Sequence, residues 1–213
     1  MRYAIALTAL TAAIVAAPFA LAAQDGPAMP TEAPGRPDSA RVTAGTYATD
    51  PTHTLVGWRV NHFGFNDYFG QFGNITGTMT LDPANPSAAT LDISIPISGL
   101  ASASSALNEH MQRADFFDMA NHPTARFVSR RVTVTGSNAA IEGNLTIRGV
   151  TRPITLAARF VGAGNNPFNS KATVGFHATA TVKRSEFGMG YGIPLVADDV
   201  ALDISVAFER QSG

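Results

Sequence analysis

Apolar and polar residues alternate one by one along much of the chain, and residues 139–160 show the pattern on two successive arms. The first arm carries apolar or small residues at every second position, namely Ala139, Ile141, Gly143, Leu145 and Ile147. The second arm repeats this with Ile154, Leu156, Ala158 and Phe160. A period of two predicts β-strands with one dry face and one wet face. Gly149 can adopt the positive φ of a reversal and Pro153 suits a strand's first residue, so we expect a β-hairpin.

The same period predicts eight strands in total, at residues 54–62, 73–81, 89–97, 125–135, 139–147, 154–160, 172–182 and 200–208. Breaks in parity predict a bulge near Gly73 and a further irregularity within residues 125–135. Residues 63–72 are rich in aromatic side chains and glycine, which predicts a loop. This loop could plug one end of the fold or form the lip of a ligand portal.

The hydrophobic period changes to three and four residues over residues 104–113, which predicts one short helix after the third strand. Ser104 or Ser105 can cap the N-terminus of this helix. Phe116 and Phe117 follow it directly, and two adjacent side chains cannot both face one way on a helix or a strand. We therefore expect one or both phenylalanines to insert into the core as a plug.

Eight sequential antiparallel strands commonly close into a barrel, because closure removes exposed sheet edges. The predicted fold class is therefore all-β, with an eight-stranded antiparallel barrel and one inserted helix. An outer-membrane barrel would need two aromatic girdles, and one Trp and four Tyr are too few to build them. We therefore expect the dry face to point inward.

An eight-stranded barrel can be filled by its own side chains or can hold one small ligand. Several inward positions carry small residues, namely Ala139, Gly143, Ala158, Ala172, Ala178 and Ala180. A packed core prefers larger side chains that interdigitate, so small residues on several rows indicate room for a guest. The alternative is that these alanines fit a tight taper of the barrel.

The N-terminal residues 1–23 have the layout of a secretory signal peptide, with Arg2, an apolar run over residues 4–17 and small residues after Pro18. This run is shorter than the ~20 residues that span a bilayer, and no later stretch is long enough. We expect cleavage after Ala22 or Ala23 and a periplasmic location, with no membrane span in the mature chain. Residues 24–44 are rich in proline and predict a flexible leader, and residues 45–213 predict one barrel domain.

The chain has balanced charges and few residues in patterns typical of catalysis or metal binding. The chain has 15 basic and 16 acidic residues without a basic stripe, which argues against a nucleic-acid partner. The five histidines show no metal-ligand spacing, and no catalytic motif accompanies them. They are His53, His62, His110, His122 and His177. A binding protein is thus favoured over an enzyme, with a protein-interaction module that uses the aromatic loop as an alternative. The sequence leaves a homodimer open.

Candidate ligand contacts follow from these positions. The apolar candidates are Trp58, Phe63, Phe65, Phe72, Met111, Phe116, Phe117, Phe127, Phe176, Ala178 and Phe187. Three polar side chains, those of His62, His110 and Arg184, could meet a headgroup. The alternatives are a backbone carbonyl for His62, an outward position for His110, and for Arg184 an ion pair with Asp115, Asp118 or Asp199.

Several motifs together resemble one known family. They include L-N-E-H-M-Q-R-A-D-F-F-D at residues 107–118, G-N-L-T-I-R-G-V-T-R-P at 143–153 and K-R-S-E-F-G at 183–188. Over roughly residues 47–210 the chain resembles the YceI-like family of bacterial periplasmic lipid-binding proteins. Trp58 departs from the family, which more often has Phe at this position.

The resemblance implies a lipocalin-like barrel with a long hydrophobic cavity and no catalytic activity. It implies a carrier for a long-chain isoprenoid lipid, of the polyprenyl or isoprenoid quinone type. A fatty acid or fatty amide is the alternative ligand. No metal and no cofactor is expected, other than such a lipid or quinone held as a ligand.

Overall fold

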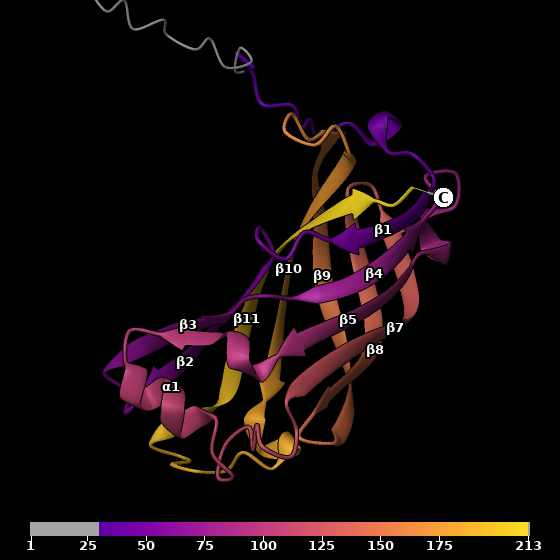
Figure 1. Cartoon of the computed structure of the whole chain (residues 1–213). Helices are drawn as coiled ribbons and strands as arrows, with labels where there is room; N and C mark the ends of the chain where they lie inside the picture. The colour runs from indigo at the N-terminus through magenta and orange to yellow at the C-terminus, as the bar shows by residue number, and fades with distance from the viewer. Residues whose placement is uncertain (1–29, 213) are drawn as a thin grey trace, which may run out of the picture. The chain divides into compact units, whose positions relative to one another are not determined.

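One continuous antiparallel sheet contains the eleven strands of the part of the chain that the structure describes (Figure 1). The structure is a computed structural model and describes residues 30–212. The predicted signal peptide and the first residues of the predicted leader lie outside the described residues. The strands are β1 Gly45–Thr49, β2 Leu55–His62, β3 Asn66–Phe72, β4 Thr76–Leu81, β5 Thr90–Pro96, β6 Leu100–Ser102, β7 Thr124–Thr135, β8 Asn138–Ile147, β9 Val150–Asn165, β10 Ala172–Lys183 and β11 Val196–Arg210.

Eight of these strands close into a barrel. Their order is β1-β4-β5-β7-β8-β9-β10-β11, and the pairing of β1 with β11 completes the ring. The predicted all-β, eight-stranded antiparallel barrel is confirmed. Closure removes the two outer edges that an open sheet would have, although β9 keeps stretches near both of its ends that pair with only one ring strand.

The first strand of the ring differs from the prediction. We expected residues 54–62 in the ring, but this segment is β2, which pairs with β11 and β3 outside it. The ring uses β1 instead, which has only five residues and too short an alternation to stand out. Both strands find a partner because β11 has 15 residues and pairs with β1 near one end and β2 near the other.

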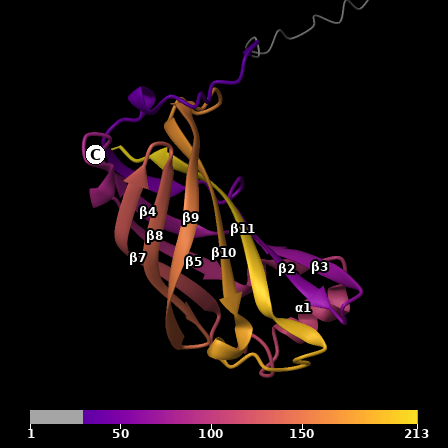
Figure 2. The same ribbon diagram turned by 180° about the vertical axis from the view of Figure 1, so that it is seen from behind.

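The strands β2, β3 and β6 form an extension of the sheet beside α1 (Figure 2). The prediction of a loop at residues 63–72 is wrong. Strand β3 occupies most of this segment and pairs with β2 from Asn66 to Phe72. Glycine and aromatic content suggested a loop, but Tyr68 and Phe72 turn toward the core while Phe69 between them is exposed. That alternation belongs to a half-buried strand.

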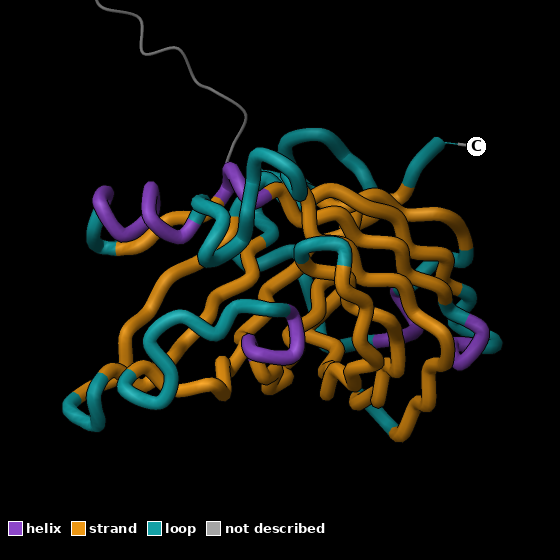
Figure 3. Tube along the Cα trace, turned by 90° about the horizontal axis from the view of Figure 1, so that it is seen from below, coloured by secondary structure: helices purple, strands orange, loops and turns teal. Residues whose placement is uncertain are grey.

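The helix α1, Ser105–Met111, follows β6 at the predicted place. Its N-cap is Ser104, whose hydroxyl accepts a hydrogen bond from the amide of Leu107 at 3.2 Å. Four short 3-10 helices occupy connections, namely η1 Ser39–Arg41, η2 Pro86–Ala88, η3 Ile97–Gly99 and η4 Arg184–Phe187. The helical segments lie at the margins of the sheet, joined by loops (Figure 3).

The β8–β9 hairpin has a tighter turn than predicted. Arg148 and Gly149 alone form it, with φ of 52° and 73°, and Pro153 lies inside β9 opposite Asn144. A proline is tolerated there because β10 pairs with β9 only from Ala157 onward, so β9 has a single neighbour at Pro153. The irregularity predicted in β7 is confirmed by a register shift between Ser129 and Arg131.

The core has a dense end next to α1. Phe117 is 9% exposed and meets Phe72 edge-to-face, with ring centroids 5.4 Å apart, so the predicted insertion is confirmed for this residue. Phe187 and Met189 from the η4 region are buried in the same cluster. Phe116 is half-buried and packs against the cluster from outside. These side chains stop the barrel interior at this end.

Candidate ligand-binding site

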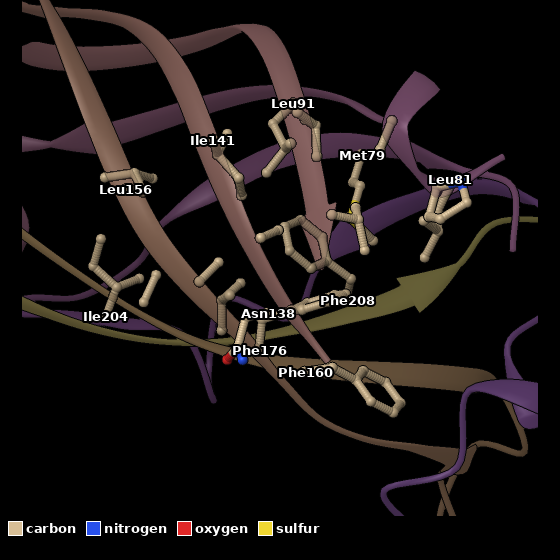
Figure 4. Close-up of a pocket in the computed structure, with 18 of the residues that line it drawn as sticks. Met79, Leu81, Leu91, Asn138, Ile141, Leu156, Phe160, Phe176, Ile204 and Phe208 are labelled. Carbon is tan, nitrogen blue, oxygen red and sulfur yellow. The ribbon is translucent and has the colours of Figure 1, made fainter. Parts of the chain in front are cut away.

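A cavity of about 570 Å³ lies inside the barrel, away from the dense end (Figure 4). Such a volume falls within the range of ~300–1,000 Å³ typical of ligand pockets. Inward side chains from seven ring strands line it, among them Met79, Leu91, Phe127, Ile141, Leu156, Phe176, Ile204 and Phe208. The strand alternation places these apolar residues on the inner face, as the sequence predicts.

The cavity is long as well as apolar. Ile154 and Phe160 of β9 both line it, and six residues of strand at ~3.3 Å each separate them by about 20 Å. The lining continues in the same direction along β11, two strands away, from Leu202 to Phe208. This length suits an extended hydrocarbon chain better than a compact ring system.

Three neighbouring alanines give the cavity its width. Ala158 lies opposite Ala139 on one side and opposite Ala178 on the other, so the three form a row across β8, β9 and β10. All three line the cavity. The small residues of these rows thus leave space inside the barrel. Gly143 is different, because a Cβ there would lie 2.4 Å from Cζ of Phe127, whose ring fills that space.

The polar groups of the cavity are few and uncharged. Among the described residues, the lining includes no Asp, Glu, Lys, Arg or His, and its polar side chains are those of Ser39, Thr54, Ser137 and Asn138. The Thr54 hydroxyl bonds to the backbone of Ala207, donating to the carbonyl at 3.4 Å. Ser137 and Asn138 lie at the β7–β8 turn, so polarity gathers at the end opposite the dense core. The arrangement can hold a chain in a dry interior with its polar end at this mouth.

Three of the predicted contacts line the cavity, namely Phe127, Phe176 and Ala178. The structure does not bring the other predicted residues to it. Trp58, Phe72, Phe117 and Phe187 are buried in the dense end, and Met111 and Phe116 pack against that cluster. Phe63 and Phe65 lie on the β2–β3 turn with 47% and 86% of their surface exposed. The His62 ring lies against that of Phe63 at a tilt of 40°, with ring centroids 4.1 Å apart.

The ring of Trp58 occupies the space that a side chain at Gly70 would need. A Cβ at Gly70 on the neighbouring strand would lie 2.0 Å from the Trp58 ring, so only a glycine admits the ring there. The buried indole Nε1 has no hydrogen-bond partner. The larger ring therefore fills the dense end and does not reshape the cavity.

Arg184 is buried, and its partners differ from those predicted. The guanidinium donates four hydrogen bonds of 2.7–2.9 Å to backbone carbonyls, those of Met189, Tyr191, Val196 and Ala197. The alternative of an ion pair with Asp115, Asp118 or Asp199 is wrong, because four of the five guanidinium N–H groups meet these carbonyls instead. Burial lowers the pKa of Arg184, and the nearby Asp198 opposes this.

His110 belongs to the outer side of α1. Its Nε2 lies 2.7 Å from Oδ2 of Asp115, and its ring meets Phe116 and Tyr191 edge-on at 5.1 and 5.2 Å. The hydrogen bond with His110 lowers the pKa of the Asp115 carboxyl. This pair ties the last turn of α1 to the segment that follows it, and the ring contact with Tyr191 joins α1 to the loop before β11.

Sequence reasoning missed two groups of lining residues. Aliphatic side chains such as Leu91, Ile141 and Ile204 form most of the wall, and their inward parity could have identified them. The second group precedes the barrel and comprises Pro37, Ser39, Ala40 and Val42. No periodicity marks these residues, so only the folded chain reveals their position.

Among residues 30–212, no group of three or more His, Cys, Asp or Glu is placed to hold a metal ion. None of the helices there is long and apolar enough to cross a membrane.

The fold and the cavity define a class, a closed eight-stranded antiparallel barrel with an apolar hollow. Within this class the chain belongs to the YceI-like family, because the YceI-like domain model matches residues 47–208. A UPF0312 protein of Pseudomonas aeruginosa (strain LESB58) is 33% identical over 159 residues, which is 75% of this chain and 83% of the relative. The protein YceI of Salmonella arizonae is 34% identical with the same coverage.

Solved structures share the fold. Burkholderia cenocepacia BcnA superposes with a TM-score of 0.67 at 22% identity, covering 75% of this chain and 98% of that one. A polyisoprenoid binding domain from Saccharophagus degradans, implicated in plant cell wall breakdown, gives a TM-score of 0.60 at 13% identity. It covers 78% of this chain and 98% of that one. At these identities the likeness concerns the fold alone.

Proposed function

We propose that this protein is a periplasmic carrier that holds the tail of a long-chain isoprenoid lipid, of the polyprenyl or quinone type, in its barrel. One observation carries the proposal, the cavity of about 570 Å³ with a wholly uncharged and largely apolar lining. Membership of the YceI-like family and the polyisoprenoid-binding neighbour support the ligand class. The signal-peptide pattern of residues 1–23 supports the location.

The free energy of lipid transfer favours reversible binding over irreversible capture. Each methylene moved from water into the cavity contributes ~0.8 kcal/mol, so a tail of several isoprene units binds favourably despite the cost of ordering. A lipid tail in a membrane is already dry, and its transfer into a dry barrel is nearly neutral. A near-neutral transfer allows the protein to load and to release its cargo.

Binding is also favoured over catalysis. The residues that line the cavity include no carboxylate, imidazole, amine or thiol, and general acid–base chemistry needs such a titratable group near the substrate. The His110–Asp115 pair lies on the outer side of α1 and does not line the cavity.

Native mass spectrometry of protein recovered from a bacterial periplasm tests the proposal. We expect a chain cleaved after Ala22 or Ala23 that carries a lipid adduct, identified as an isoprenoid after organic extraction. The Ala178→Trp variant should fold but lose the adduct, at least tenfold in occupancy, because the indole fills the row of alanines.

Thr179→Trp is the matched control, since Thr179 is the exposed neighbour on the outer face of the same strand. It should retain lipid as the natural chain does. An adduct that survives Ala178→Trp, or a fatty acid in the extract, would contradict the proposal.

A further inference from the structure

Residues 34–42, here called the strap, run along the mouth of the cavity before the barrel begins. Pro37, Ser39, Ala40 and Val42 all line the cavity. The strap passes the tips of β9 and β10 and continues toward β1 (Figure 1). It lies outside residues 47–208, which match the family domain, so the barrel of the family does not account for it.

The strap binds to a stretch of the β9 edge that the barrel leaves unpaired, and this stretch is here called the seat. β8 pairs with β9 only as far as Arg159, whereas β9 continues to Asn165. Beyond Arg159 the backbone of Arg36 replaces β8, donating to the Ala163 carbonyl at 3.0 Å and accepting from its amide at 2.9 Å. This reciprocal pair is the hydrogen-bonded register of an antiparallel ladder. An open edge of this kind is a natural site for one added strand.

Two glycines shape the seat. A Cβ on Gly164 would lie 2.2 Å from the carbonyl oxygen of Pro34, and a Cβ on Gly162 would lie 3.1 Å from that of Arg36. Glycine in a strand often marks the close approach of another backbone. Gly175 of β10, which pairs with Gly162 of β9, offers a contrast. A Cβ on Gly175 would have no neighbour nearer than 3.8 Å.

The other end of the strap is held more firmly. Val42 packs against the smaller hydrophobic cluster, which includes Tyr47 and Phe208. The Tyr47 hydroxyl donates to the Thr43 carbonyl, and Arg210 Nε donates to the carbonyl of Ala44 at 3.2 Å. Between this anchor and the β9 seat, every residue is exposed. A segment with so little buried surface opens at low free-energy cost while the barrel stays intact.

We propose that the strap is part of the binding site, closing the mouth over a bound tail and peeling off β9 to let it leave. This proposal rests on the proposed lipid-binding function. The strap adds the apolar surface of Pro37, Ala40 and Val42 to the wall, and it brings the Ser39 hydroxyl to the same mouth as Ser137 and Asn138. These groups suit an uncharged headgroup, a hydroxyl or a carbonyl.

The test compares release rates in the full mature chain. Each protein is loaded with radiolabelled geranylgeraniol, an uncharged isoprenoid alcohol, and mixed with phosphatidylcholine vesicles that accept the label. Gly164→Val places a side chain where the Pro34 carbonyl lies, so we expect release about tenfold faster than from the natural chain. Gly175→Val is the matched control, with the same substitution on the neighbouring strand at a position where a Cβ meets nothing nearer than 3.8 Å, and its rate should be unchanged.

Hydrogen exchange of the Ala163 amide reports the seat itself. Gly164→Val should accelerate this exchange at least tenfold, while amides in the centre of β10 stay protected. Equal release rates for Gly164→Val and the natural chain would overturn the proposal, as would unchanged exchange at Ala163. A natural chain that takes up no geranylgeraniol would refute the binding function, and the exchange measurement would still decide whether the strap is seated on β9.

Discussion

A buried arginine needs acceptors for its donors, and Arg184 finds four of them in the carbonyls of its own loop. The side chain thereby ties the loop before β11 and the first two residues of that strand to the end of β10. The parity of β10 correctly places Arg184 inward. Its partners come from a loop without periodicity, so the sequence alone suggested a headgroup or an acid.

Arg184→Met tests this role. The variant keeps much of the apolar stem but leaves four carbonyls without their donor, and each unsatisfied buried group costs about 1–3 kcal/mol. We expect the free energy of unfolding, measured in urea, to fall by about 3 kcal/mol or more. Arg184→Lys should recover only part of the loss, because one ammonium cannot reach all four acceptors. A loss below about 1 kcal/mol in Arg184→Met would show that water satisfies the carbonyls.

At the scale of elements, the β9–β10 connection depends on one carboxylate of β11. Glu209 accepts hydrogen bonds from Asn169 at 2.7 Å, Lys171 at 2.9 Å and Asn166 at 3.2 Å. The bond from Asn169, together with those from Lys171 and Asn166, lowers the pKa of Glu209 below its ordinary value of 4.5, although burial acts in the opposite direction. The loop beside the strap's seat is thus ordered by a charge.

This arrangement predicts a pH dependence with a defined sign. A lowered folded-state pKa means that the carboxylate stabilises the fold above pH 4.5, and that this stabilisation is lost as the pH falls through the folded-state value. At pH 7 we expect Glu209→Gln to be less stable than the natural chain by about 1–2 kcal/mol. Urea unfolding of both proteins from pH 7 to pH 3 should show the difference shrinking. A difference that stays constant would contradict the role of the charge.

At the scale of the whole molecule, the barrel has two unlike ends. Aromatic side chains, α1 and η4 fill one end, while the apolar hollow extends to the other, beneath the strap. The packed end stabilises the fold. The hollow end contributes less, because the side chains around a void lack the van der Waals contacts that they would make in a filled core. A ligand that fills the hollow should therefore stabilise the folded chain as a whole.

Thermal unfolding checks that expectation. A ligand at 100 times its dissociation constant adds about 2.7 kcal/mol to the folded state, which for a chain of this size raises Tm by about 5–10 °C. We expect this shift for geranylgeraniol with the natural chain and with Thr179→Trp. Ala178→Trp should show no shift, because its cavity is occupied. Equal shifts in both variants would place the ligand outside the barrel.

The sequence by itself determined the strand class, the closed antiparallel barrel, the capped helix and the inward rows of β9, β10 and β11. These features follow from local periodicity and capping, which each segment carries in its own residues. The inward row of β10 places Phe176 and Ala178 on the cavity wall, and Phe127 of β7 lies there too.

Only the tertiary structure decided which strands complete the ring, which end stays hollow, and what covers the mouth. The exchange of β1 for β2 depends on the length of β11, and the plug depends on loops that meet across the barrel. The strap's seat joins Arg36 to Ala163 across more than a hundred residues. Such contacts depend on which strand edges stay unpaired and on the space between segments. The alternation of apolar and polar residues predicts neither.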